Sequence, residues 1–373
     1  MGENGLVIVG LSGGVDSAVS ALLLREAGYD VQCLQMSNWE DDGYCDAAQD
    51  FQDALEIARH LNLPLHRVNF AEEYREQVFS HFLAEYHAGR TPNPDVLCNR
   101  QIKFGAMRRY AHRLGADLVA TGHYARLEQR DGRVQLLKGR DSGKDQSYFL
   151  HAVDETGFTD VRFPLGGLTK AAVRSRALNA GLKVADKRDS TGICFIGERP
   201  FAKFLGEYLP ADPGQIKSQD GEVLGEHQGL AYYTLGQRQG LRIGGLAAHG
   251  PEPWYVAAKD HDCNELIVVQ GSDHPLLYQN WLTATAAHWV NDEPAGMSDG
   301  KELKCRAKTR YRQPDQACTV TRRDEDRLEV WFDRPQRSVT PGQYVVFYRE
   351  DRCLGGATIQ TAAMHTLSLE AAV

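Results

Sequence analysis

The sequence predicts an N-terminal α/β domain, built on a parallel sheet with helices on both faces, followed by two smaller β-rich domains. Strand-like and helix-like segments alternate over about the first 200 residues, as in a parallel sheet with helical crossovers. A turn rich in proline and glycine follows at 210–214, and β-like runs dominate after it. Because 373 residues exceed one ordinary core, we expect domains at 1–203, 204–278 and 279–373.

The elements of the first domain can be predicted in order. The apolar run 6–9 ends at Gly10 and is typical of a buried central strand. A helix is expected from Asp16 to Ala27, where Gly28 ends it. The same alternation then predicts strand 31–36, a helix with apolar residues at 51, 54, 55, 58 and 61, strand 65–70, helix 72–88 and strand 117–121.

The remainder of the chain has short β-like stretches separated by glycines. They predict a small β-rich domain up to about residue 275. Further β-like runs follow from about residue 281, among them 328–332 and 344–348. These runs predict a compact antiparallel β-barrel as the third domain.

Composition limits the classes of function. No apolar stretch is long enough to span a bilayer, and Met1 to Gly5 lacks the basic cluster of a secretory signal, so we expect a cytoplasmic protein with no membrane partner. The net charge of −8 argues against general affinity for nucleic acid but allows a local basic surface. None of the eight cysteines forms a C-x-x-C pair, which argues against a zinc ribbon or an iron–sulfur cluster.

A glycine-rich loop lies between the first strand and the first helix. Its residues are Gly10, Leu11, Ser12, Gly13, Gly14, Val15, Asp16 and Ser17. Glycines let backbone amides approach an anion closely, and the N-terminus of the following helix favours negative charge. The serines add hydroxyl donors, Asp16 can hold a magnesium ion that bridges phosphates, and the lysine of a Walker loop is missing. An ordinary strand-to-helix turn is the alternative, but the position after an apolar strand favours a nucleotide site.

Cys98 is the first candidate for cysteine chemistry. It follows Asn93, Pro94 and Asp95 and precedes a helix expected over about 100–114, so we expect it at or just before the helix N-terminus. The helix dipole would lower the pKa of the thiol there and favour a reactive thiolate. Asp95 lies close enough along the chain to transfer protons at the same site. The alternative is that a polar neighbour caps the helix and Cys98 packs in the core.

Cys194 is the second candidate. It lies in an apolar, strand-like piece bracketed by Gly192 and Gly197. A cysteine between Ile193 and Phe195 is more often a core residue than a catalytic one, so the residue pattern alone favours a structural role.

The glycine-rich loop and the two cysteine segments resemble motifs of known proteins. The loop 10–17 resembles the SGGxDS loop of the ATP pyrophosphatase superfamily, which has an adenine nucleotide α-hydrolase-like, Rossmann-like fold. Its members adenylate an oxygen atom and release pyrophosphate. The segments 93–99 and 190–197, together with the run 233–241, are similar to those of the tRNA-specific 2-thiouridylases, and the resemblance covers nearly the whole chain.

The resemblance implies roles for individual residues. In that family the later cysteine, here Cys194, carries sulfur as a persulfide that the earlier one, here Cys98, attacks. ATP is implied to contact the loop together with Met36 and Gly122. The residues implied to contact tRNA are Asn93, Pro94, Asp95, His123, Lys144, Asp145, Gln146, Arg310, Tyr311 and Gln343. By residue pattern alone, His123 is equally well a capping or core histidine, and 144–148 a solvated turn.

Five cations alternate with other residues in the third domain, at positions 304, 306, 308, 310 and 312. If this run is one strand, its side chains point alternately to two faces and one face is wholly cationic. An RNA backbone lying across that face would relieve the repulsion. A solvated, charged edge strand is the alternative, but the lack of interleaved acids favours RNA.

The residue patterns predict an enzyme that uses ATP and Mg²⁺, and the resemblance implies that it places sulfur at C2 of the wobble uridine of tRNA. We expect the third domain to bind the anticodon arm, and a sulfur-carrier or cysteine desulfurase-relay protein to supply the sulfur. An amide-forming ligase of the same superfamily and a 4-thiouridine synthase share the loop and are the alternatives. A non-catalytic tRNA-binding protein would explain the basic run but not the loop and the two cysteines.

Overall fold

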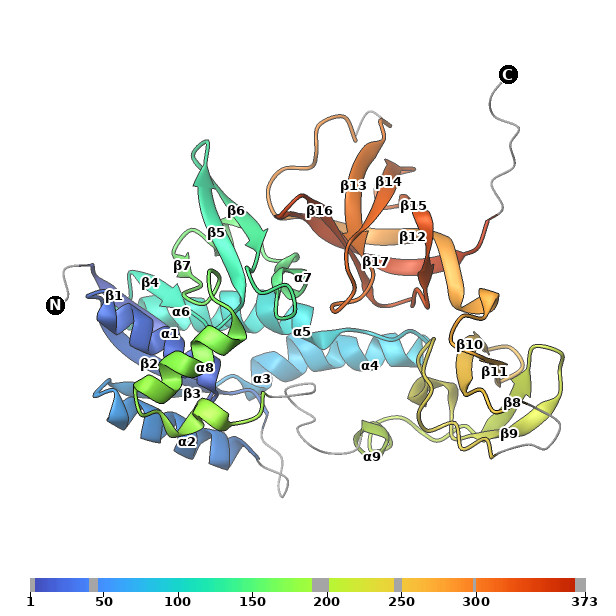
Figure 1. The fold of residues 1–373 in the computed structure, drawn as a ribbon, viewed down its shortest axis with the longest axis horizontal. Coiled ribbons are helices and arrows are strands. Elements are labelled where there is room, and N and C mark those ends of the chain that lie inside the picture. The colour runs from blue at the N-terminus through green and yellow to red at the C-terminus, as the bar shows by residue number, and fades with distance from the viewer. Residues whose placement is uncertain (1–3, 40–45, 190–200, 245–249, 298–299, 366–373) are drawn as a thin grey trace.

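The computed structural model describes residues 4–39, 46–189, 201–244, 250–297 and 300–365. Cys194 and the whole motif 190–197 therefore lie outside the described residues. Figure 1 shows three parts: an α/β domain that begins the chain, a small β-sheet, and a barrel made by the last strands. The long helical segment that contains α4 (Ser80–His87) leads from the α/β domain towards the small sheet.

The sheet of the first domain has five parallel strands in the order β3-β2-β1-β4-β7. Their bounds are β1 Leu6–Gly10, β2 Asp30–Ser37, β3 Leu65–Asn69, β4 Leu118–Ala120 and β7 Val161–Arg162. The strand order reverses between β1 and β4, and ligands of such sheets bind beyond the carboxyl ends of the strands at that point. The predicted parallel sheet is confirmed.

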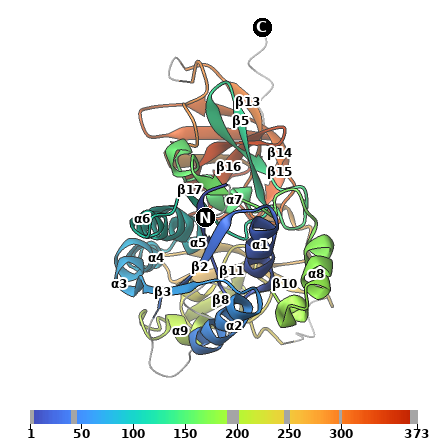
Figure 2. The same ribbon diagram turned by 90° about the vertical axis from the view of Figure 1, so that its left-hand side faces the viewer.

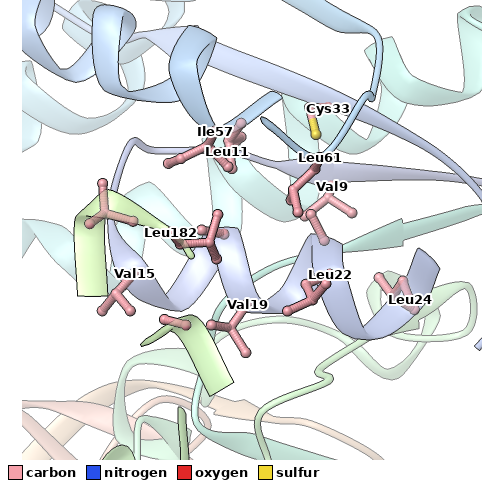
Figure 3. Packing of buried hydrophobic residues seen from close by; sticks show 14 of the residues in the cluster. Val9, Leu11, Val15, Val19, Leu22, Leu24, Cys33, Ile57, Leu61 and Leu182 are labelled. Carbon is pink, nitrogen blue, oxygen red and sulfur yellow. The ribbon is translucent and has the colours of Figure 1, made fainter. Parts of the chain in front are cut away.

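Helices cover both faces of this sheet (Figure 2). Val7 and Val9 of β1 belong to one buried cluster and Ile8 to another, because successive side chains of a strand point to opposite faces. The first cluster is packed around α1, as Figure 3 shows, and its helices are α1 Val15–Glu26, α2 Asp46–His60 and α8 Lys170–Asn179. The second cluster includes side chains from α3 Ala71–Tyr74, α4, α6 Arg108–Arg113 and α9 Phe201–Leu205.

Two helices contain π-helical segments. One joins α3 and α4 through Arg75–Phe79, close to the predicted helix 72–88. The other runs from α5 (Pro94–Leu97) through Cys98–Met107 into α6. No helix in the described part of the chain is long and apolar enough to cross a membrane.

The predicted start of the second of these helices, near residue 100, is wrong. It begins at Pro94, because the Asn93 side chain accepts the Asp95 N–H at 3.2 Å and proline is well suited to the first helical position. Cys98 consequently lies inside the helix, one turn beyond its start, and not at the N-terminus where the dipole argument placed it.

The rest of the chain forms two β domains, as predicted. A four-stranded sheet has the order β10-β11-β8-β9, with β8 Gly214–Ser218, β9 Val223–His227, β10 Trp254–Asp260 and β11 Glu265–Gln270. The barrel contains β12 Tyr278–Trp289, β13 Leu303–Lys308, β14 Gln316–Arg322, β15 Leu328–Arg337, β16 Tyr344–Arg349 and β17 Arg352–Ala363. Its strands are antiparallel, and the pairing of β12 with both β15 and β17 closes it.

A hairpin of the first domain extends the barrel sheet. It consists of β5 (Ala125–Arg130) and β6 (Arg133–Lys138), and Leu137 of β6 pairs with Arg352 of β17. One buried cluster crosses this junction and includes Leu136 of the hairpin and Val346 of the barrel. The first domain and the barrel therefore share apolar packing as well as strand pairing.

The prediction of one strand with a wholly cationic face over 304–312 is wrong. β13 ends at Lys308, whose ammonium is buried and lies 3.1 Å from the carboxylate of Asp145. The Arg310 guanidinium donates to the carbonyl oxygens of Leu235 and Ser338, at 2.8 and 2.9 Å. The alternation of charge was real, but three of the five cations have acceptors within the chain, because Arg306 also pairs with the Asp315 carboxylate at 3.3 Å.

Candidate functional site

The glycine-rich loop connects β1 to α1 at the carboxyl edge of the sheet. Gly13 has a φ of +79°, and a side chain there would lie 2.5 Å from the carbonyl oxygen of Asp50. The Ser17 hydroxyl accepts the Ser12 N–H at 3.2 Å and donates to the Gly14 carbonyl at 3.0 Å. Because Gly14 caps α1 and has no side chain to bind the first amides, those donors are oriented for an anion.

The other two predicted nucleotide residues lie on the same edge. Met36 is near the end of β2, and Gly122 follows β4. A side chain on Gly122 would come within 2.9 Å of the backbone of Asp16 and Ser17, so the turn after β4 packs directly on the loop. Glycine at these close approaches leaves a cradle of backbone amides, which fits the phosphates of a nucleotide.

Asp16 is held by two side chains from elsewhere in the domain. Its carboxylate accepts from the Tyr124 hydroxyl at 2.7 Å and from the Lys170 ammonium at 2.7 and 2.8 Å. Lys170 is the first residue of α8, and its side chain is only 12% exposed. The loop itself contains no lysine, but Lys170, which is far from it in the sequence, contacts it through Asp16.

Lys170 connects Asp16 to Asp189, whose carboxylate is 2.7 Å from the same ammonium. Lys144 at 2.6 Å and Arg174 at 3.1 Å also bind Asp189. Burial alone would raise the pKa of Asp189, but hydrogen bonds from Lys144 and Lys170 lower it to about 2. Asp189 is therefore a carboxylate at any ordinary pH, fixed beside the loop.

Cys98 and Asp95 lie on the helix that begins at Pro94, which packs against the face of the sheet to which Ile8 points. Cys98 is 1% exposed and belongs to the buried cluster that includes Ile8 of β1. Asp95, less than one turn earlier, is half-buried, and burial raises the pKa of its carboxyl while the charge of Lys103 lowers it. A carboxyl with a raised pKa, three residues before a cysteine on the same helix, suits proton transfer.

The described residues on either side of the segment that carries Cys194 lie beside the glycine-rich loop and in the buried cluster that contains Cys98. The segment follows Asp189, which is bound beside the loop, and precedes α9. Phe204 of α9 is buried in the same cluster as Cys98. In the sequence, four residues separate Asp189 from Cys194.

The barrel binds the chain that leads into Asn93. The Gln343 amide donates to the carbonyl oxygens of Thr91 and Pro92, at 2.8 and 3.3 Å, and the Pro341 carbonyl accepts the Thr91 N–H at 2.9 Å. A cavity of about 300 Å³ adjoins this contact, lined by Thr234, Leu235, Gly236, Gln237, Arg310, Thr340 and Gln343. Two residues that the resemblance linked to tRNA, Arg310 and Gln343, thus meet at one junction of domains.

The segment 144–146 lies at a second junction, between the first domain and the barrel. The Tyr311 hydroxyl donates to the Lys144 carbonyl oxygen at 3.2 Å. Asp145 is 3% exposed and binds Lys308, while the Gln146 side-chain oxygen accepts the Tyr124 N–H at 2.9 Å. The segment is therefore packed against the barrel and is not a solvated turn, and its contact with tRNA stays a prediction.

His123 is a buried residue. Its ring binds the Thr121 hydroxyl at 2.7 Å and the Asn99 side-chain oxygen at 3.2 Å, between the rings of Phe104 and Phe163. Burial holds the pKa of His123 well below its usual range, so the ring is neutral at physiological pH. Its implied contact with tRNA stays a prediction as well.

Comparisons with known proteins give the chain a family. Three family models match it: a tRNA methyl transferase HUP domain over 5–198, a tRNA methyl transferase PRC-barrel domain over 202–270 and an aminomethyltransferase beta-barrel domain over 279–359. The tRNA-specific 2-thiouridylase MnmA of Methylococcus capsulatus is 59% identical over 95% of both chains. The chain belongs to the tRNA-specific 2-thiouridylase family.

Other members of the 2-thiouridylase family match over the same length. Those of Pseudomonas fluorescens and Chromohalobacter salexigens are 58% and 56% identical, over 95% and 96% of this chain and 95% and 94% of their own. A solved 4-thiouridine synthetase bound to RNA and ATP is 19% identical over 52% of this chain and 46% of its own, with a TM-score of 0.34. That likeness is too low to carry an argument.

Sequence reasoning missed Lys170 and Tyr124 as neighbours of the loop. Lys170 has a local signal only for structure, since Thr169 before it accepts the Ala172 N–H as a helix cap. Because Lys170 is far from Asp16 in the sequence, their contact could not be predicted. The contact forms because α8 packs against α1.

Proposed function

We propose that this chain catalyses the ATP-dependent 2-thiolation of the wobble uridine of tRNA, with release of AMP and pyrophosphate. The observation that carries the proposal is the identity of 56–59% with tRNA-specific 2-thiouridylases over at least 94% of both chains. The loop at the carboxyl edge of the sheet and the cysteine-bearing helix behind it supply groups suited to the two halves of this reaction.

The first half-reaction is adenylation. The loop 10–17 binds the phosphates of ATP through its amides and serine hydroxyls, with Met36 and Gly122 lining the nucleotide. The C2 oxygen of uridine, drawn out to Asn93–Asp95, attacks the α-phosphate, and pyrophosphate departs. Asp16 would supply the carboxylate that holds Mg²⁺, because a magnesium ion bound to phosphate oxygens usually has only one or two protein carboxylates as further ligands. The bound ion would neutralise phosphate charge.

The second half-reaction transfers sulfur. A persulfide on Cys194 attacks C2 of the activated uridine, and AMP leaves with the former C2 oxygen. The Cys98 thiolate then attacks Sγ of Cys194, so that a Cys98–Cys194 disulfide forms and the outer sulfur stays on the base. In the variant order Cys98 attacks first and releases hydrosulfide, which displaces AMP. Both orders consume one persulfide and leave one disulfide, which an external thiol reduces. Asp95 moves the proton at Cys98.

The partners follow from this chemistry. Arg310, Tyr311 and Gln343, with the segment 144–146, form the proposed contact surface for the anticodon arm of tRNA. A persulfide-bearing donor protein charges Cys194, because the reaction needs sulfur at the oxidation level of a persulfide.

The test is an assay with the purified chain, unmodified tRNA, ATP, Mg²⁺ and a persulfide or sulfide source. Nucleosides from the digested tRNA are analysed by mass spectrometry while AMP and pyrophosphate are followed. We expect 2-thiouridine at the wobble position, with AMP formed in proportion. AMP without 2-thiouridine would refute the acceptor, and 4-thiouridine would favour the other thiolation reaction. If neither product forms, the proposal fails.

A further inference from the structure

The loop 10–17 contains no lysine, yet two lysines from other parts of the first domain reach it. Lys170 binds the carboxylate of Asp16, and Lys187 donates to the Gly13 carbonyl oxygen at 3.3 Å. A polyphosphate bound by backbone amides alone would retain most of its charge. The electrostatics of the site therefore depend on which of these ammonium groups can turn to a phosphate.

Lys187 is committed to structure. Its ammonium lies 2.9 Å from Asp50 and 2.5 Å from Asp53, both on α2, and so ties α2 to the loop. If Lys187 turned to a phosphate, these carboxylates would lose the one cation that pairs with them among the described residues. Loss of two ion pairs opposes such a movement.

Lys170 differs from Lys187, because each carboxylate that it binds also accepts hydrogen bonds from other side chains. Asp189 retains Lys144 and Arg174 if Lys170 leaves, and Asp16 retains the Tyr124 hydroxyl. Asp16 would also become available to a cation that bridges phosphates. Lys170 can therefore exchange acceptors without leaving an isolated buried carboxylate behind.

The backbone that bears Lys170 is firmly held. Its N–H donates to the Asp141 carboxylate at 2.8 Å, and Thr169 caps the helix. Val173 and Ala177 of α8 are fully buried in the cluster that contains α1. A fixed backbone and a flexible four-carbon side chain suit a lysine that follows a phosphate group as it departs.

We propose that Lys170 is the phosphate-binding lysine of this site: it exchanges the Asp189 carboxylate for the β- and γ-phosphates of ATP and stabilises the departing pyrophosphate. This inference rests on the proposed function only for the identity of the nucleotide. The loop supplies directional donors, and Lys170 supplies the positive charge that the loop lacks.

The test measures binding rather than turnover. Affinities of the full chain for Mg²⁺–pyrophosphate, Mg²⁺–ATP and AMP are determined by isothermal titration calorimetry for the wild type, Lys170→Met and Lys170→Arg. Lys170→Met should weaken pyrophosphate and ATP binding by roughly 10- to 100-fold, the value of one charged hydrogen bond, and AMP binding by far less. Lys170→Arg should recover part of the loss. Lys183→Met is the matched control, since exposed Lys183 pairs with Glu56 outside the loop.

A second variant keeps the proposal testable if Lys170→Met does not fold. Asp189→Asn removes the competing carboxylate and leaves Lys170 in place, so pyrophosphate affinity should rise. Two results would overturn the role of Lys170 while the proposed function stands. One is a folded Lys170→Met variant whose pyrophosphate affinity is within twofold of the wild type. The other is an Asp189→Asn variant that binds pyrophosphate more weakly than the wild type. If the wild type binds neither ATP nor pyrophosphate, both fail together.

Discussion

At the scale of single residues, burial determines the charge states that the chemistry requires. Asp95 and His123 lie in the first domain, and burial moves their pKa values in opposite directions: it raises that of Asp95 and lowers that of His123. Both shifts favour the neutral form. Asp95 therefore holds a proton more readily than an exposed carboxyl does, whereas His123 stays an uncharged hydrogen-bonding group.

Replacement of Asp95 separates stability from activity. Its pKa is raised in the folded state, so wild-type folding loses stability as pH rises from the unfolded pKa, near 3.9, through the folded one. Asp95→Asn carries no such charge. Its unfolding midpoint should exceed that of the wild type at pH 8 by about 1–3 °C and equal it near pH 4, while thiolation falls at least tenfold. Differential scanning fluorimetry across this pH range checks the first part, and nucleoside analysis the second.

Cys98→Ser should abolish 2-thiouridine formation, because a hydroxyl cannot attack a persulfide sulfur at neutral pH. Affinity for ATP should stay within about twofold of the wild type, since the thiol lies in the apolar cluster behind the sheet. Nucleoside mass spectrometry and calorimetry measure the two quantities. Cys263→Ser, at an exposed site in the central domain, is the matched control and should thiolate normally. Thiolation by Cys98→Ser would disprove the assignment.

At the scale of elements, close backbone approaches hold the nucleotide site together. The turn after β4 touches the first turn of α1 only because Gly122 has no side chain. Sequence spacing placed Gly122 at the strand end, but its contact with Asp16 follows from the pairing of β1 with β4.

Gly122→Ala should therefore weaken ATP binding. The added methyl group would meet the backbone of Asp16 and Ser17 at 2.9 Å, so the loop or the turn must move. We expect a loss of affinity of roughly tenfold or more, with the fold retained. Calorimetric titration with ATP measures it. Gly167→Ala is the control, because a side chain there would have no neighbour within 4 Å; an equal loss in that variant would contradict the explanation.

The barrel hairpin of β13 and β14 contains a cysteine pair. Cys305 and Cys318 are direct cross-strand partners, and their sulfur atoms are 3.7 Å apart. Opposite residues of antiparallel strands have the Cα separation that disulfides require. Treatment with a low-molecular-weight disulfide should join them, with release of two equivalents of small thiol. Peptide mapping without reductant should find the crosslink, and the barrel should unfold at higher temperature. A Cys305→Ser variant should show neither change.

At the scale of the whole molecule, a buried ion pair joins the first domain to the barrel. The two residues of this pair, Lys308 and Asp145, are 7% and 3% exposed. Asp145 also accepts the N–H groups of Gly139 and Ser147, so the carboxylate organises its own segment as well. Tyr311 and Gln343 add contacts from the barrel to Lys144 and Thr91.

Removal of one partner of this pair should be costly. Lys308→Met leaves a buried carboxylate without its cation, which destabilises proteins by about 3–5 kcal/mol. The double variant Lys308→Met with Asp145→Asn should recover much of this loss. Chemical denaturation measures both, and tRNA affinity should follow the stability of the domain junction. If the single and double variants are equally destabilised, the ion pair is not what joins the domains.

The elements, and the chemistry that depends on local residue patterns, could be predicted from the sequence. Alternating apolar runs predicted the parallel sheet and the barrel, and the glycine-rich loop after β1 predicted the nucleotide site, because strand periodicity and backbone freedom are local properties. The motifs around Cys98 and Cys194 placed the chain in its family, although the positions of Cys194 and its neighbours lie outside the described residues.

Contacts between groups that are distant in the chain could not be predicted, because they depend on how the elements pack. The contacts of Lys170 with Asp16, of Lys308 with Asp145 and of the β5–β6 hairpin with β17 join segments far apart in the chain. The predicted cationic strand was wrong because a charge pattern does not identify its acceptors, which packing brings together. The predicted position of Cys98 at a helix start was wrong for a local reason, because Asn93 caps a helix that begins at Pro94.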